Sequence, residues 1–533
     1  EVNSTDILSA IRLGCQTMGS VFDADDNDVP FFEVVVRPDA RLMFNSYYSD
    51  AQVPGRHLNA LLNAQDAAGV DLAEEVVEKH SRAAFFSYGG PVALPLNRVK
   101  KGGPLVNFAP HNLREGFHAL YALAKYRGSG QARSVAETSV DAILRYWDPK
   151  GGWNFDGLEG DYKLQCRRDA VIYGIARAIG ALVKYYQATA YGPALELATV
   201  LKDKAVEEYL GPDGGYDGER FGHHTHSTTC VMSSLAQFAD LTSDSALMSR
   251  VKTFYDNGLW DVRDALGWVI ESSIPDANPD LGEVNNSGDI LETALILGCW
   301  GYTECFQDAE RILRGHILPS QLRDVSFIRQ PSNPENVDGR RDVPHRVRGA
   351  FGFPAPYGHQ PLEAPAGFAD LRGFQSGCCG TTIVKFNMDV VGGAVGSLCE
   401  ALRKAVTLDE SGHHVNLLFD HDTPDIAVES PYTHPTLRVM VRRPAPLYVR
   451  IPRWVNDDTL KVDGADREIG YFNGYAYFPE PPVGRWLSFS FPMAWSEDVL
   501  LHRTREIRMR LRGDEVVTMD DFGADLTFFD PFE

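Results

Sequence analysis

Two adjacent cysteines between glycines are the most distinctive chemical feature of this sequence. Cys378 and Cys379 lie in Gly-Phe-Gln-Ser-Gly-Cys-Cys-Gly-Thr-Thr, residues 373–382. The glycines allow a sharp turn and a close approach to other groups. A thiolate here could attack carbon or bind a soft metal if the rest of the chain supplies partners. The alternative is packing alone, since free cysteine is among the most buried residue types.

Histidines and acids elsewhere could supply these partners. Histidines stand at the expected starts of three helices, in Gly-Arg-His57-Leu, Pro-His111-Asn-Leu and Gly-His223-His224-Thr-His226. One histidine at such a place is usually a cap or a buried structural group. Histidines at the same point of successive hairpins would instead converge on one end of a helical ring. An acidic segment runs from Glu283 to Glu292, although acids in a loop are usually solvated.

Repeated helical hairpins are the elements that must position these residues. Apolar-periodic stretches alternate with short polar turns, and each unit has the pattern helix, turn, helix. The units span residues 118–146, 181–206, 234–255 and 294–317. A single hairpin cannot bury its apolar face, so the units stack into a solenoid or close into a ring. The sequence leaves both arrangements open.

Other segments flank the hairpins. Residues 6–19 have the pattern of a short amphipathic helix, and residues 31–45 that of two extended segments about a Pro-Asp-Ala turn. Residues 320–376 are rich in Pro, Gly and Arg and predict a long covering loop. A last helix is expected at 394–405, and alternating strands and turns follow from residue 407.

Composition limits the classes of partner. The chain has 533 residues and a net charge of −22, which disfavours nucleic acid and anionic membranes as partners. The eight cysteines lack the spacing of a disulfide scaffold. No run of 18 apolar residues and no signal-type N-terminal stretch occurs, so we expect a soluble protein, either cytoplasmic or secreted with its signal removed.

The order of these motifs resembles glycoside hydrolase family 127, the β-L-arabinofuranosidase-like proteins. The resemblance spans about residues 50–500. The motifs are Pro-His111 with Gly116 and Tyr121, Gly-His223, Glu292-Thr, Cys378-Cys379 and Val449-Arg-Ile-Pro-Arg-Trp454. The family fold implies an (α/α)6 barrel over residues 1–406 and an antiparallel β-sandwich over 407–533. The implied activity is retaining, exo-acting hydrolysis that removes a terminal furanose-type or related sugar from an oligosaccharide or glycoside.

The resemblance also implies roles for individual residues. Cys378 would be the nucleophile, on a zinc ion bound by Cys378, Cys379 and Glu292. Zinc deprotonates a thiol that is otherwise mostly protonated at neutral pH. Glu283 would be the general acid, with Glu271 as the rival because the spacing from Glu283 to Glu292 is shorter than the family's. Ala294 stands where the family has another zinc-binding cysteine.

A sugar pocket is expected at one end of the helical ring. His57, His111 and His223 would line it, beside loops at 148–160, 211–222 and 272–288. The segment 320–376, with Tyr357 and His359, would form a roof over this pocket, although a passive surface loop is the alternative. A roofed pocket admits a chain end, which predicts release of single sugars or short oligosaccharides.

Two other functions remain open at this point. A polysaccharide lyase would need a Tyr or His base and an Arg to neutralise a uronate carboxylate, and Tyr121, Tyr173, Arg167 and Arg168 could supply them. A non-catalytic glycan-binding protein would suit the aromatic content of 11%. We also consider a homodimer.

Overall fold

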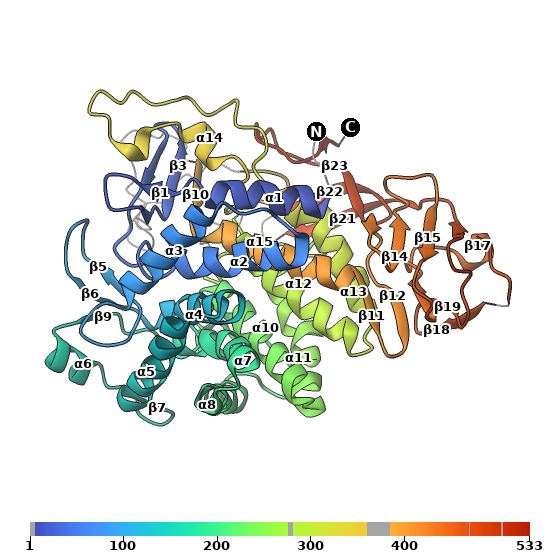
Figure 1. The fold of residues 1–533 in the computed structure, drawn as a ribbon. Coiled ribbons are helices and arrows are strands. Elements are labelled where there is room, and N and C mark those ends of the chain that lie inside the picture. Colours follow the sequence, from blue (N-terminus) through green and yellow to red (C-terminus); the bar gives the residue numbers. More distant parts are fainter. Residues whose placement is uncertain (1–5, 275–280, 360–383, 468, 503–504, 533) are drawn as a thin grey trace.

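A closed ring of six helices forms the centre of the protein (Figure 1). The computed structural model describes residues 6–274, 281–359, 384–467, 469–502 and 505–532. Each inner helix packs on the next, and the last packs on the first. In ring order they are α2 (Val53–Ala68), α4 (Leu113–Arg127), α7 (Ile179–Thr189), α10 (Thr225–Thr242), α12 (Val284–Cys299) and α15 (Met388–Ala405). The hairpins therefore close into a barrel and do not form a solenoid.

Six further helices pack around this ring. They are α1 (Ile7–Met18), α3 (Glu74–Ser87), α5 (Gly130–Tyr146), α8 (Gly192–Glu208), α11 (Ser245–Asp256) and α13 (Glu304–Ile312). Side chains cap several of their starts; for example, Asp244 accepts the backbone N–H of Leu247 at 3.0 Å. Because inner and outer helices alternate along the chain, all six inner helices begin at the same end of the barrel. This is the (α/α)6 fold that the family resemblance implies.

Small sheets and short helices lie in the connections. The extended pair at 31–45 is β3 (Glu33–Arg37) and β4 (Arg41–Met43), and β10 (Val384–Asn387) pairs with β3. A second sheet joins β5 (Leu96–Arg98), β6 (Leu105–Phe108) and β9 (Gln165–Cys166). Other short strands and α-helices in the connections are β1 (Phe22–Asp23), β2 (Val29–Pro30), β7 (Trp147–Asp148), β8 (Gly152–Trp153), α6 (Phe155–Tyr162), α9 (Gly218–Phe221) and α14 (Val343–Val347).

Two five-stranded sheets with a shared apolar core form a β-sandwich after the barrel. The first is β11 (Val406–Asp409), β12 (Gly412–Val415), β16 (Leu447–Arg450), β19 (Tyr475–Phe478) and β18 (Gly470–Phe472). The second is β13 (His421–Asp422), β14 (Ile426–Glu429), β15 (Leu437–Val441), β20 (Trp486–Ser490) and β17 (Lys461–Asp463). All neighbouring strands are antiparallel except β12 and β16. The division into domains 1–406 and 407–533 stays a prediction.

A four-stranded sheet follows the sandwich and packs against the barrel. It contains β21 (Trp495–His502), β22 (Arg505–Arg512), β23 (Glu515–Met519) and β24 (Asp530–Pro531). Leu511 on β22 shares an apolar core with Leu266 of the barrel. The Val449–Trp454 motif also joins the two parts, because Arg450 forms a buried ion pair with Glu310. Breaking such a pair by removing one partner typically costs about 3–5 kcal/mol.

Several boundaries differ from the sequence-based expectation. The last barrel helix begins at Met388 and not at residue 394, because burial in the ring holds a start that contains two β-branched valines and the pair Gly392-Gly393, all of low helix propensity. The expected loop 148–160 contains the start of α6, and the last five residues of the expected loop 272–288 belong to α12. Among the described residues, no helix is long and apolar enough to cross a membrane.

Candidate functional site

Polar side chains gather at the N-terminal ends of the inner helices, where the sequence places most of its candidate residues. Every inner helix contributes at least one buried residue, within its first turn or just before it. They are Arg56 (α2), Glu115 (α4), Arg177 (before α7), His226 (α10), Glu283 and Asn285 (α12), and Asp389 (α15). Helix starts carry unpaired N–H groups and partial positive charge, so they favour carboxylates and anions.

Glu115 is the centre of a buried charge network. Its Oε1 contacts Arg56 Nη2 and lies 3.6 Å from Arg114 Nη1, while its Oε2 is 3.1 Å from His118 Nδ1. Arg177 Nη2 is 3.9 Å from the same carboxylate. Burial would raise the pKa of Glu115, but Arg56 and Arg114 hold it well below its ordinary value. The network links α2, α4 and the segment before α7.

Glu283 lies among histidines from the start of α10. Its Oε1 is 3.3 Å from His226 Nδ1, and its Oε2 is 4.0 Å from His224 Nε2. Glu271 reaches the same histidine, with Oε1 3.8 Å from His224 Nε2. On its other side, His226 Nε2 is 3.4 Å from Asp289 Oδ2. We call these two histidines and three carboxylates the His–Glu cluster.

Burial changes the protonation of the His–Glu cluster. It raises the pKa of Glu283 to about 7, and the nearby carboxylate of Asp389 adds to the rise. It also raises the pKa of Asp289 to about 6. Burial lowers the pKa of His226 well below its ordinary value. The cluster therefore favours a neutral His226, and it favours the protonated form of Glu283 over a wider pH range than for an ordinary glutamate.

Three members of the cluster have the donor atoms of a metal site. One ligand atom each from His224, His226 and Glu283 lies within 4.8 Å of the others. Two imidazoles and one carboxylate are a donor set that zinc uses in catalytic sites, where the fourth position is left for water or substrate. These residues therefore fit a zinc ion.

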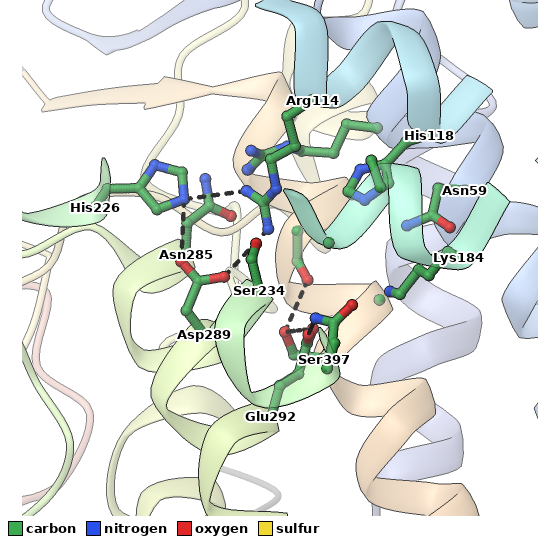
Figure 2. A pocket seen from close by; sticks show the side chains of 17 residues that line it. Asn59, Arg114, His118, Lys184, His226, Ser234, Asn285, Asp289, Glu292 and Ser397 are labelled. Atoms are coloured by element: carbon green, nitrogen blue, oxygen red, sulfur yellow. Dashed lines mark hydrogen bonds and ion pairs between the residues drawn. The ribbon is translucent and has the colours of Figure 1, made fainter. Parts of the chain in front are cut away.

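A small polar chamber lies on the barrel axis next to the cluster (Figure 2). Its volume is about 30 Å³, and all six inner helices line it. That space holds about two water molecules, whereas ligand pockets usually have about 300–1,000 Å³. Gln237 Oε1 and Asn285 Oδ1 line it, and neither accepts a hydrogen bond from a donor in the described part of the chain. The chamber is thus suited to buried water and is too small for a sugar.

Close packing of α15 forms one side of the chamber. A Cβ atom at Gly393 would lie 1.8 Å from Asn285 Oδ1 and 3.0 Å from Arg56 Nη1. A Cβ atom at Gly396, one turn further along the same helix, would meet nothing within 4 Å. Gly393 is therefore required for close approach of the helices, and Gly396 is not.

Two of the three predicted pocket histidines lie beside the cluster. His111 packs against His224 and Tyr173, with ring centroids 5.7 Å and 4.8 Å away. His223 is adjacent to His224 in the chain, but its Nδ1 lies 3.0 Å from Ser273 Oγ and its side chain is partly exposed. The structure thus shows His224 and His226, not His223, as the members of this segment that meet Glu283.

The third predicted histidine has a structural environment. His57 is fully buried, and its Nε2 is 2.8 Å from the carbonyl oxygen of Met388. Burial lowers its pKa to about 4. His57 therefore connects α2 to the start of α15, and it is not among the residues that line the chamber.

Tyr357 and His359 of the expected roof are buried in packed cores. Tyr357 belongs to the apolar core that the sheet of β21–β24 shares with the barrel. The centre of the His359 ring lies 5.0 Å from that of the Phe386 ring. The backbone of the same segment does reach the cluster: Val284 N donates to the carbonyl of Gly352 at 3.2 Å. The segment therefore borders Glu283 through its backbone.

Glu292 lies apart from Glu283, although Asp289 of the His–Glu cluster stands only three residues before it on α12 and lines the same chamber. It is nine residues after Glu283, which places it roughly 13 Å further along α12. Its carboxylate accepts hydrogen bonds from Ser397 Oγ of the chamber wall at 2.9 Å and from Ser233 Oγ at 3.4 Å. Ala294 follows two residues later, and residues at this spacing do not share a helix face. A cysteine at 294 would thus not meet the Glu292 carboxylate.

The predicted nucleophile and its neighbour, Cys378 and Cys379, lie outside the described residues. The structure adds residues that the sequence analysis did not select, above all Arg56, Arg114, Arg177 and Asp389. A charged side chain within an otherwise apolar helix is the signal that could have identified them, because burying an unpaired charge is costly.

Comparison with known proteins tests the fold. No protein-family model and no curated protein matches the chain. A solved GH127 β-arabinofuranosidase covers 95% of this chain and 79% of its own, with a TM-score of 0.57 and 14% identity. The fold of this chain is GH127-like.

Two further structures agree. A GH127 β-L-arabinofuranosidase from Geobacillus stearothermophilus T6 covers 89% of this chain and 78% of its own, with a TM-score of 0.56 and 15% identity. A protein described as a glycoside hydrolase covers 93% of this chain and 84% of its own, with a TM-score of 0.55 and 13% identity. The likeness therefore extends over the GH127-like barrel and the β-rich region together.

Proposed function

We propose that this protein is a glycoside hydrolase that removes a terminal sugar of furanose or related type from the end of a glycan. The observation that carries the proposal is the approach of two carboxylates, Glu271 and Glu283, to the same nitrogen of His224. They meet at the end of the barrel where the inner helices begin. The GH127 β-L-arabinofuranosidases of the same fold support this substrate class.

The spacing of the two carboxylates suits glycoside hydrolysis. Since Glu271 and Glu283 lie 3.8 Å and 4.0 Å from His224 Nε2, their nearest oxygens are at most about 8 Å apart. Paired carboxyl groups in glycosidases are separated by about 5–9.5 Å, depending on the stereochemical outcome. The pair is therefore close enough for both groups to act on one glycosidic bond.

Glu283 is the proposed general acid. A carboxyl with a pKa of about 7 keeps a proton near neutral pH and can donate it to the departing glycosidic oxygen. Asn285 Nδ2 donates to Glu283 Oε1 at 2.5 Å and orients the group. Cys378 is the proposed nucleophile, on the strength of the sequence resemblance. Attack of its thiolate on the anomeric carbon breaks the bond to the oxygen that Glu283 protonates. Water then attacks the same carbon, gives a proton to the Glu283 carboxylate and displaces the thiolate, which releases the sugar.

Zinc bound by His224, His226 and Glu283 would supply a positive charge that stabilises a neighbouring thiolate. A ligating carboxylate must be deprotonated, so Glu283 could not then be the acid. Glu271 would be the remaining carboxyl beside His224 and would take that role. The two assignments differ in which glutamate carries the essential proton.

A lyase is the second candidate, because the structure brings two of its predicted residues to the site. The guanidinium of Arg167 lies 5.1 Å from the ring centre of Tyr173, which also packs 4.9 Å from His224. However, Arg167 Nε already donates to Asp169 at 2.6 Å and Arg167 Nη1 to Tyr48 Oη at 2.8 Å. An arginine that is neutralised in this way is less available to a uronate, so hydrolysis is favoured.

A product assay tests the proposal. The purified protein is incubated with plant arabinan, arabino-oligosaccharides and a uronate polymer, and early products are sized. We expect single sugars or short oligosaccharides, new reducing ends and no unsaturated product, with turnover abolished in Glu271→Gln or Glu283→Gln. Ultraviolet absorbance from an unsaturated uronate would identify a lyase. A ladder of internal fragments would contradict exo-action.

A further inference from the structure

A row of stacked rings crosses the first sheet of the β-sandwich, on the face opposite its core. His414 on β12 stacks on Tyr448 of β16 with centroids 4.5 Å apart and planes 2° apart. Tyr448 stacks on Tyr477 of β19 at 4.7 Å and 28°. The pairing of strands explains the row, since each ring lies directly opposite the next. The ring spacing equals the spacing of the strands, about 4.8 Å.

The row stops at a glycine. Tyr477 pairs with Gly470 on β18, the edge strand of the sheet. Among the described residues, Tyr448 is the only ring that stacks on Tyr477. A Cβ atom at Gly470 would lie 3.4 Å from Tyr477 Cδ1, and the glycine itself is exposed. Among the described residues, the next position of the row thus carries no side chain, and we call this position at the sheet edge the slot.

Phe472 borders this slot along the strand. It lies two residues after Gly470, so its side chain points to the same face of the sheet, roughly 7 Å further along. The residue is 73% exposed, which is unusual for so large an apolar side chain. Tyr471, between them, is 63% exposed and points to the opposite face. β18 and β19 lie in the β-rich part of the molecule, away from the inner helix ring (Figure 1).

We propose that the slot over Gly470, bordered by Tyr477 and Phe472, binds one ring of a neutral glycan. The C–H face of a sugar packs on an aromatic face, because the π electrons make that face negative. A sugar in the slot would continue the row as its fourth ring. The surface is separate from the His–Glu cluster in residues and elements, and its binding does not depend on hydrolysis.

Charge favours a sugar over the other common stacking ligand, a nucleic-acid base. Bases also stack on tyrosine and phenylalanine, but their phosphates require basic neighbours. This chain has a net charge of −22. Arg467, the described arginine closest to Gly470 in the chain, already pairs with Glu480 at 2.6 Å. A neutral polymer avoids that repulsion.

Affinity gel electrophoresis tests the slot directly. The background is Glu271→Gln, which prevents digestion, and the gels contain arabinan, xyloglucan or galactomannan. We expect retardation by at least one of these polymers. Gly470→Leu should weaken it at least fivefold, because Leu fills the slot. Gly470 is not in the left-handed region, so its backbone accepts a side chain. Phe472→Ala should weaken binding similarly.

Tyr471→Ala is the matched control, since it removes an equally exposed ring from the other face of the same strand. We expect it to bind like the parent, and all three substitutions to keep parent-like melting temperatures. With an active Glu271, all three should also keep turnover of a small glycoside. No retardation by any of the polymers, or unchanged retardation in Gly470→Leu, would overturn the proposal. Binding of a single-stranded oligodeoxynucleotide that Gly470→Leu abolishes would show that the slot takes bases instead.

Discussion

Glu283 Oε1 lies 3.3 Å from His226 Nδ1, and both side chains are almost completely buried. Glu283 immediately precedes α12, and His226 lies in the first turn of α10. The contact therefore joins the starts of two neighbouring barrel helices. It combines a carboxyl whose pKa burial raises with an imidazole whose pKa burial lowers, so both neutral forms are favoured.

The stability of the protein should depend on pH through Glu283. Its pKa is about 7 in the folded protein against an ordinary 4.5, so the folded state holds this proton more tightly than the unfolded chain. The free energy of unfolding should therefore fall as pH rises from 4.5 to 7, by at most about 3 kcal/mol from this group. Urea unfolding of chelator-treated wild type and Glu283→Gln across this range measures the difference. Equal pH slopes would contradict the assignment.

Metal content should depend on the His–Glu cluster and not on Glu292. We expect about one zinc per chain in protein purified without chelators, and a loss of at least about tenfold in affinity in His226→Ala. Glu292→Gln is the matched variant, because Glu292 also lines the barrel interior but lies roughly 13 Å along α12 from Glu283. Elemental analysis of both proteins decides this. Zinc lost from Glu292→Gln but kept in His226→Ala would place the metal at Glu292.

Cys378→Ala should abolish turnover and leave the melting temperature nearly unchanged. A nucleophile on a glycine-flanked segment contributes chemistry more than packing, so we expect a loss of at least about a thousandfold in rate. Cys399→Ala is the control, since this cysteine is fully buried in α15. It should keep activity and lose about 1 kcal/mol of stability. Normal turnover in Cys378→Ala would rule out the thiolate mechanism.

Two glycines of α15 should respond in opposite directions. Gly393→Ala would place a methyl group 1.8 Å from Asn285 Oδ1, and overpacking of this kind costs about 1–3 kcal/mol. Gly396→Ala has free space and should gain about 0.5–1 kcal/mol from helix propensity. Chemical denaturation measures both. Activity should fall only in Gly393→Ala, because Asn285 orients Glu283; equal effects of the two changes would exclude this role.

Much of the architecture follows from local patterns in the sequence. Apolar periodicity predicts the paired helices, and alternation with turn residues predicts the strands after residue 407. The segment Gly222–His226 and the acids from Glu283 to Glu292 are recognisable without a structure, because their residue types carry chemistry wherever they lie. The order of these motifs also indicates the GH127-like fold. These features depend on neighbours within a few residues.

Only the tertiary structure decides which of these residues meet. His224 and His226 face Glu283 while His223 contacts Ser273, although all three histidines lie within four residues. Glu292 and Asn285 share a helix and both line the chamber, yet Glu292 accepts a hydrogen bond from Ser397 while Asn285 donates one to Glu283. The reason is geometric: a helix turns about 100° and rises 1.5 Å per residue. Which face meets the axis is therefore set by closure of the whole ring, through contacts between residues hundreds of positions apart.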